Sequence, residues 1–231
     1  MRKTLAVLEP LFLLCLPMVF LVCAYAGTKY TALLTVLAAC VSAAPFFLRF
    51  EKKAPRPRDI MPIVVLAAIA AAGRIVFAPF PNFKPVSAIV IISGASFGRQ
   101  SGFLTGALAA LASNMFFGQG PWTPWQMYAW GLIGYIAGIL GCLKILEKPL
   151  AVYIFGFLSA LIYGFFLDSW HLFGFFSPVT WQAAVLVYGA GLPFSLVHAV
   201  ATVIFLLPTY RVWRKKLSRI KEKYALMEND G

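Results

Sequence analysis

Charged side chains are scarce in this sequence. Only 12% of its 231 residues are Asp, Glu, Lys or Arg, whereas 61% are hydrophobic. A soluble domain has about 25% charged residues, and a chain of this length would need more polar groups to cover its surface. The shortage excludes a water-soluble enzyme, a secreted disulfide scaffold and a disordered chain. The sequence therefore predicts an integral membrane protein.

Acidic residues and catalytic signatures are also in short supply. The chain has eight Asp and Glu residues, twenty Lys and Arg residues and two histidines. The chain has no Walker A glycine loop, so it should not hydrolyse ATP itself, and it has no HExxH zinc motif. Four cysteines lie inside apolar stretches without metal-ligand spacing: Cys15, Cys23, Cys40 and Cys142. These absences predict a protein that is not an enzyme, with no catalytic residue, metal or cofactor.

Apolar blocks separated by charged or Pro/Gly clusters predict an all-α fold, a polytopic bundle of transmembrane helices. A spanning helix needs about 20 apolar residues, and fewer where other helices bury it. The fourth and fifth blocks are short and separated by only Arg99 and Gln100, which predicts a tight helical hairpin or a broken pair near a cavity. The eight predicted segments are 5–26, 30–48, 60–78, 86–98, 101–117, 127–146, 150–168 and 182–208.

Basic residues predict the orientation of this bundle. The net charge is +12, but the basic residues form short runs between apolar blocks, a pattern typical of loops that face anionic headgroups rather than nucleic acid. With the N-terminus inside, every Lys and Arg except Lys29, Arg74 and Lys84 falls on the cytoplasmic side. The positive-inside rule then predicts eight crossings with both termini in the cytoplasm. The loops 79–85, 118–126 and 169–181 would lie outside.

The proline-rich, basic stretch 50–59 divides the chain. Its prolines argue against a helix through it, so it is predicted to be a cytoplasmic linker. Before it lies an N-terminal transmembrane helix pair, residues 1–49, and after it a six-helix substrate-binding core, residues 60–208. Residues 209–231 form a basic cytoplasmic tail, predicted to be a solvated helix or an amphipathic helix at the headgroups.

The predicted outer face interleaves rigid aromatic rings with amides. An aromatic belt at the membrane interface explains tryptophans there, but it does not need the polar residues among them. Rings with amides indicate a pocket for a flat, polar-edged organic ligand. The candidate binding residues of this rim are Asn82, Lys84, Gln119, Trp122, Trp125, Gln126, Trp170, His171, Trp181 and Gln182.

Several polar residues lie at membrane depth. Arg74 precedes the outer end of its helix by four residues, and Asp168 ends another helix at the same face. A charge buried there costs at least roughly a few kcal/mol, so each should pair with the other or contact the ligand. Asn114 is expected to hydrogen-bond across helices or to line the pocket. His198, in the middle of a helix, is either a satisfied core histidine or a proton relay.

Small residues recur at helical spacing in two places. Glycines 94, 98, 102 and 106 predict close packing within the short helix pair. Ala67, Ala68, Ala71 and Ala72 form two small-xxx-small pairs on the segment 60–78. The alanine pairs predict either packing inside the bundle or a face onto which another helix docks.

These features together resemble the substrate-binding S-component of energy-coupling factor (ECF) vitamin transporters, over about residues 60–208. The resemblance rests on the alanine-rich helix, the loop Phe80-Pro81-Asn82-Phe83-Lys84-Pro85 with the helix after it, the segment 102–107 and the long block 113–131. It implies a multi-pass protein of a bacterial cell membrane that captures a micronutrient outside. It also implies docking, through Ala67, Ala68, Ala71 and Ala72, onto a transmembrane coupling subunit that works with two ATPase subunits.

The substrate and the role of the extra helix pair stay open at this point. The loop rich in Trp and Pro looks like that of members linked to cobalamin or related corrinoids, and a smaller vitamin or precursor is the alternative. Two other function classes also stay open. One is a membrane-embedded enzyme or lipid-processing protein that uses Arg74, Asp168 and His198, and the other is a scaffold that transports nothing.

Overall fold

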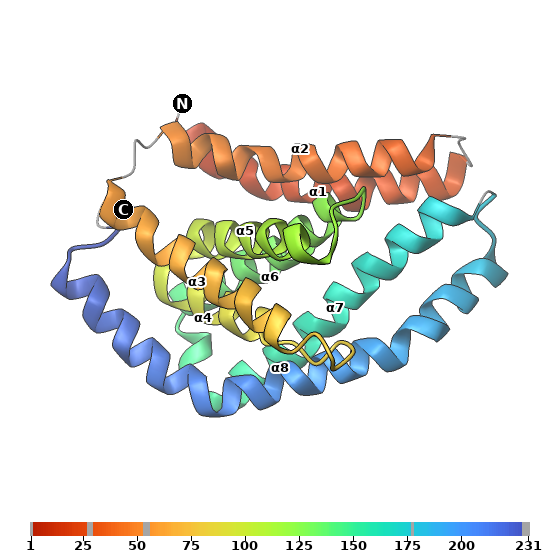
Figure 1. The fold of residues 1–231 in the computed structure, drawn as a ribbon. Coiled ribbons are helices and arrows are strands. Elements are labelled where there is room, and N and C mark those ends of the chain that lie inside the picture. The colour runs from red at the N-terminus through yellow and green to blue at the C-terminus, as the bar shows by residue number, and fades with distance from the viewer. Residues whose placement is uncertain (1, 27–29, 53–55, 177, 228–231) are drawn as a thin grey trace.

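The computed structural model describes residues 2–26, 30–52, 56–176 and 178–227. Within these ranges the chain forms eight α-helices and a short 3-10 helix, so the predicted all-α fold is confirmed (Figure 1). The elements are α1 (Arg2–Ala26), α2 (Thr31–Lys52), α3 (Pro57–Val76), α4 (Val86–Phe97), α5 (Arg99–Phe117), α6 (Thr123–Cys142), η1 (Ile145–Glu147), α7 (Pro149–Phe175) and α8 (Trp181–Lys223).

Four helices in the described chain are long and apolar enough to cross a membrane. These candidate spans are Thr31–Leu48 within α2, and the whole of α3, α7 and α8. The twelve residues of α4 rise about 18 Å, which is short of the roughly 30 Å hydrocarbon core. A multi-pass membrane protein is therefore confirmed by helix length and hydropathy. Eight crossings and cytoplasmic termini stay predictions.

The helices form three groups in space. The pair α1 and α2 lies along one side, α3 to α6 fill the middle, and α7 and α8 close the other side (Figure 1). Helix α8 bends as it passes beneath the bundle, and it contains Pro193 and Pro208, the ordinary cause of a helix kink. Because α8 continues to Lys223, the first part of the predicted tail extends the last helix directly.

The short helices α4 and α5 form the predicted tight hairpin. Gly98, with φ of +93°, is the single residue between them, and this left-handed conformation favours glycine. Helix α4 is hydrophobic all round and is buried on nearly every face, as expected for a helix in the centre of a bundle.

The glycine spacing is explained by a backbone-to-backbone crossing of α4, α5 and α6. A Cβ at Gly134 of α6 would collide with the carbonyl of Gly102, and one at Gly94 would collide with the carbonyl of Gly134. A Cβ at Gly106 would meet the backbone of Trp130. Close packing is confirmed at Gly94, Gly102 and Gly106, while Gly98 makes the turn instead.

The alanine face of α3 is split by the packing. Ala67 and Ala71 are 3% and 6% exposed and lie inside the bundle, where α3 packs on α5 and α4. Ala68 and Ala72 point outward and are exposed. The prediction of one docking face made by all four alanines is therefore wrong for Ala67 and Ala71, because the neighbouring helices of the same chain already cover them.

The N-terminal helix pair shares a hydrophobic core with the rest of the bundle. The ring of Phe46 in α2 stacks on Phe103 of α5, with 3.8 Å between ring centroids. The hydroxyl of Tyr128 in α6 donates to the carbonyl of Leu13 in α1 at 2.6 Å. Aromatic contacts and a buried hydrogen bond therefore join the pair to α5 and α6.

Candidate functional site

A cavity of about 480 Å³ opens between α3, α5, α6, α7 and α8, beside the loop that follows α3. We call this the loop end of the bundle, because residues 77–85 form part of its wall. Six candidate binding residues from the sequence line this cavity, and none of its lining residues comes from α1 or α2. The six are Arg74, Asn82, Lys84, Gln126, Asp168 and His171.

Arg74 is the most constrained charge in the cavity. Its Nη1 donates to Ser113 Oγ and to Asn114 Oδ1, both at 2.6 Å. The guanidinium lies over the rings of Phe117 and Trp130, at 4.7 and 5.2 Å from their centroids. Cation–π contacts and neutral dipoles thus hold the side chain in one orientation.

A series of hydrogen bonds between polar side chains holds Asn114, the partner of Arg74, in place. Asn114 is fully buried, and its Nδ2 donates to Gln126 Oε1 at 2.7 Å and to Thr123 Oγ1 at 3.0 Å. Thr123 in turn donates to Gln119 Oε1 at 2.9 Å. The expectation that Asn114 bonds across helices is confirmed, and the loop before α6 is tied to the guanidinium through it.

Three stacked rings form another wall. Trp130 stacks on Tyr163 with 4.5 Å between centroids, and Tyr163 stacks on His198 at 5.1 Å. His198 Nε2 is 2.7 Å from the Ser87 hydroxyl, which also accepts from Trp130 Nε1 at 3.2 Å. His198 is thus a buried histidine with a hydrogen-bond partner, and its ring faces the cavity.

Lys84 supplies a second cation from the loop 77–85. Its Nζ donates to the carbonyl of Phe77, which anchors it across the turn after α3. Burial and the nearby charge of Arg74 lower the pKa of Lys84 from its ordinary value. Two positive groups therefore lie close enough to repel each other at this wall.

Asp168 and His171 occupy the wall formed by α7. The Asp168 carboxylate packs against Gly191 of α8, where a Cβ would collide with it. In the described part of the chain no ion pair joins Asp168 to Arg74, so the mutual pair considered from the sequence does not form. The reason is that Ser113 and Asn114 hold the guanidinium on the α5 side.

The loop tryptophans lie away from the cavity. Trp125 is 0% exposed and Trp170 is also buried, with 5.9 Å between their ring centroids. Both belong to the core shared with α1 and α2. Trp181 is 78% exposed, and Gln182 beside it is exposed too.

Two further rim residues have local roles. Trp122 packs its ring on Gly120, and the exposed Gln119 donates from Nε2 to the Leu111 carbonyl at 2.9 Å. The aromatic lining of the cavity comes instead from Phe117, Trp130, Tyr163 and Phe194, which the sequence did not single out as binding residues. Trp130 could have been found by its spacing, since it follows Gln126 by four positions and shares its helix face.

One spacing in the sequence matches a hydrolase motif. Gly94-Ala95-Ser96-Phe97-Gly98 fits G-x-S-x-G, but that motif needs a strand-to-turn-to-helix context to expose its serine. Here Ser96 lies near the end of helix α4, and both histidines of the chain line the cavity at the loop end instead. Ser96 therefore does not lie on the strand-to-helix turn that a nucleophile elbow requires.

The chemistry available in the loop-end cavity is that of binding. It combines a fixed guanidinium, a second cation, one carboxylate, amides and flat rings. Among the described residues no group of three or more His, Cys, Asp or Glu side chains could hold a metal ion. Such a set of groups suits an organic ligand with a charged group and a planar part.

Comparisons with known proteins give one match. No curated protein and no solved structure matches the chain. A family model described as a family of unknown function matches residues 53–218, which begin after α2 and include every residue that lines the loop-end cavity. The chain therefore belongs to the DUF6580 family, a family of unknown function.

Proposed function

We propose that this chain is the substrate-binding subunit of a membrane importer, and that it captures a small organic anion in the loop-end cavity. The observation that carries the proposal is Arg74, a guanidinium that faces a cavity while no carboxylate of the described chain pairs with it. A charge at membrane depth without a counter-ion is costly and normally marks a functional site.

The geometry of Arg74 favours a carboxylate as the missing partner. Ser113 and Asn114 take both hydrogens of Nη1, so within the described chain the edge formed by Nε and Nη2 makes no hydrogen bond. That edge presents two parallel N–H groups, which a carboxylate accepts in bidentate fashion. Lys84, on the same cavity wall, adds a second positive charge for the same anionic group.

The size and the walls of the cavity restrict the ligand further. A volume of about 480 Å³ lies within the range of sites for single small molecules, which is about 300–1,000 Å³. A corrin ring with its amide side chains is larger than this space. The cavity therefore favours the smaller vitamin or precursor, and the stack of Trp130, Tyr163 and His198 suits a planar part of it.

The energy source and the partners in this proposal come from the resemblance to ECF S-components. That resemblance implies a transmembrane coupling subunit and two ATPase subunits. The chain has no nucleotide-binding loop of its own, so ATP hydrolysis would be the task of such partners. On α3, Ala68 and Ala72 are the alanines that remain exposed for a partner helix.

The test is mass spectrometry of small molecules retained by the purified protein. We expect the wild type to retain a compound that carries a carboxylate, and Arg74→Gln to lose it. Arg211→Gln removes the same charge at an exposed position of α8 that lines no cavity described above, so it should retain the compound. Unchanged retention in Arg74→Gln would refute the proposal, and conversion of the compound would favour the enzyme alternative.

A further inference from the structure

A second cavity lies at the other end of the bundle, which we call the basic end. Its volume is about 590 Å³, and it shares no residue with the loop-end cavity. Its walls are the turn between α4 and α5, the end of α6, the last part of α8, and Met227. Three basic side chains line it, namely Arg99, Arg214 and Lys221.

The positive charges at the basic end are only partly balanced. Arg99 Nε lies 3.2 Å from Glu9 Oε2, so this charge is paired. Arg214 Nη1 donates to two neutral oxygens at 3.3 Å, the Leu146 carbonyl and the Tyr210 hydroxyl. Glu222 lines an adjoining pocket, where its Oε1 accepts from Ser218 at 3.2 Å. In the described residues no carboxylate forms an ion pair with Arg214 or Lys221.

Residues with neutral donors border the same space. The Ser96 hydroxyl is buried and has no hydrogen-bond partner among the described residues, although its residue lines both basic-end pockets. Helix α5 begins here at Arg99, and no side chain caps it. The first N–H groups of a helix lack intrahelical acceptors, and their dipole favours an anion.

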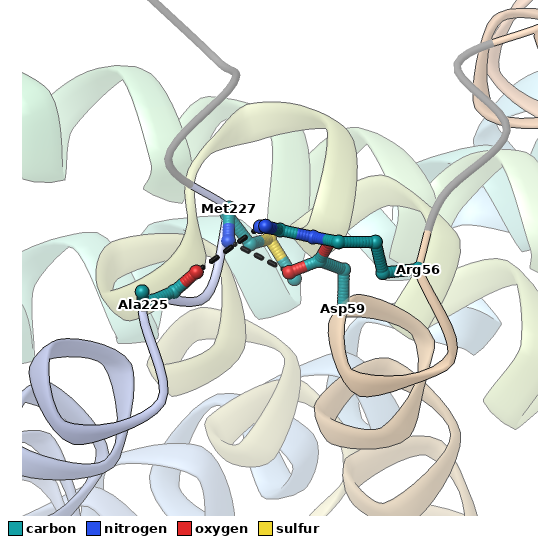
Figure 2. Close-up of polar contacts among 4 residues, drawn as sticks. All are labelled: Arg56, Asp59, Ala225 and Met227. Carbon is teal, nitrogen blue, oxygen red and sulfur yellow. Dashed lines mark hydrogen bonds and ion pairs between the residues drawn. The ribbon is translucent and has the colours of Figure 1, made fainter.

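The outer wall of this cavity is held in place by the chain end. The Met227 N–H donates to Asp59 Oδ1 at 2.9 Å, and Arg56 Nη2 donates to the Ala225 carbonyl at 3.1 Å (Figure 2). Arg56 and Asp59 also form an ion pair at 2.9 Å. The start of α3 thus clamps the turn that follows α8, so the part of the wall formed by Met227 is held in place.

We propose that the basic-end cavity binds a phosphate group through Lys221, Arg214, the Ser96 hydroxyl and the N-terminus of α5. Lys and Arg side chains, a hydroxyl and helix N–H groups are the donors that phosphate oxygens accept from in proteins. The phosphate can come from a lipid headgroup or from a soluble phosphate ester, because the same donors recognise both.

The experiment measures binding to the full-length purified protein by its thermal unfolding midpoint and by native mass spectrometry. The probes are inorganic phosphate, glycerol 3-phosphate and dihexanoyl phosphatidic acid, with dihexanoylglycerol as the phosphate-free control for the lipid. We expect at least one phosphate compound to bind and raise the midpoint, while dihexanoylglycerol does not. Binding of phosphatidic acid alone identifies a lipid headgroup, and binding of glycerol 3-phosphate or inorganic phosphate identifies a soluble phosphate.

Matched variants test the site itself. Lys221→Gln should weaken phosphate binding about tenfold or more, since it removes a charge-assisted hydrogen bond. Lys215→Gln makes the same change on the exposed side of α8 and should leave binding unaltered. Ser96→Ala is a second, uncharged variant that should weaken binding several-fold without altering the net charge.

Two results would overturn the inference. One is that none of the three phosphate compounds binds the wild type more tightly than chloride at the same ionic strength. The other is that Lys221→Gln and Lys215→Gln lower the affinity equally while Ser96→Ala lowers it not at all, which would mean nonspecific charge attraction. Neither result bears on the loop-end cavity.

Discussion

The two ends of this bundle hold positive charge in different ways. At the loop end, Arg74 is fixed by two hydrogen bonds and two aromatic rings, so one edge of its guanidinium has a set direction. At the basic end, Lys221 is a flexible cation, and the hydrogen bonds of Arg214 to described residues go to neutral oxygens. A fixed, planar donor selects geometry, whereas flexible cations select charge. The comparison teaches that the loop end is built for discrimination and the basic end for attraction.

The helix crossing that both ends share should be among the most sensitive parts of the molecule. Gly134→Ala would place a Cβ against the Gly102 carbonyl, so it should lower the free energy of unfolding by about 3 kcal/mol or more. Gly189→Ala in α8 is the matched control, because a Cβ there meets nothing within 4 Å. Thermal unfolding in detergent measures both. Equal stability of the two variants would contradict the crossing.

Trp125→Ala separates stability from ligand affinity at the loop end. Its ring is 0% exposed in the core shared with α1 and α2, so its loss should cost about 3–5 kcal/mol of unfolding free energy. Trp181→Ala, at an exposed ring, should change stability by less than about 0.5 kcal/mol. If Trp125→Ala instead folds normally and loses only the retained compound, the rim tryptophans form the pocket after all.

Asn114→Ala tests whether the orientation of Arg74 matters. The variant removes one of the two acceptors of Nη1 and the donor to Gln126, so we expect about tenfold weaker retention of the loop-end compound. Phosphate binding at the basic end should not change. Gln182→Ala alters an exposed amide of α8 and serves as the control. A loss at both ends would show general unfolding rather than a local effect.

Deprotonation of Lys84 should change the free energy of unfolding and the affinity for an anion in opposite directions. Its pKa is lowered from 10.5, so just below that pH the unfolded chain binds more protons than the folded chain. The contribution of Lys84 to the free energy of unfolding should therefore rise with pH in this window. Affinity for an anion should fall there, because Lys84 loses its charge.

The measurement compares pH titrations of the wild type and Lys84→Gln by unfolding and by ligand binding. The difference between the two proteins isolates the lysine from other groups that titrate at alkaline pH. Parallel titration curves would exclude Lys84 from the anion site.

The smallest effect on the loop end should follow removal of the helix pair. A chain that begins at Arg56 keeps every residue of the loop-end cavity, so its affinity should stay within about threefold of the wild type, or about 0.7 kcal/mol. At the basic end the same truncation removes Glu9, which frees Arg99, so phosphate should bind more tightly. Glu9→Gln should reproduce the gain at the basic end. A folded truncation that binds nothing at the loop end would contradict this division.

Much of the candidate site was accessible from the sequence through a simple rule. Polar and ionisable residues in an apolar helix are costly and need a reason, and this argument found Arg74, Asp168 and Asn114. The tryptophans misled because residue type alone does not say which side of a loop or helix a ring faces. Trp125 and Trp130 lie on one helix, and only the packing shows that Trp125 faces the core around α1 and α2 while Trp130 faces the cavity.

Hydropathy and glycine spacing by themselves determined the membrane class, the eight helices and the tight α4–α5 hairpin, because these properties follow from local composition and period. The partners of each side chain were decided by tertiary structure alone. Ala67 and Ala68 are neighbours in the chain, yet only the first is buried in the bundle. Arg74 and Asp168 were expected at matching depth, either paired with each other or in contact with the ligand, yet Ser113 and Asn114 take the guanidinium. Depth along a helix can be counted from sequence, but the direction a side chain faces depends on which helices pack around it.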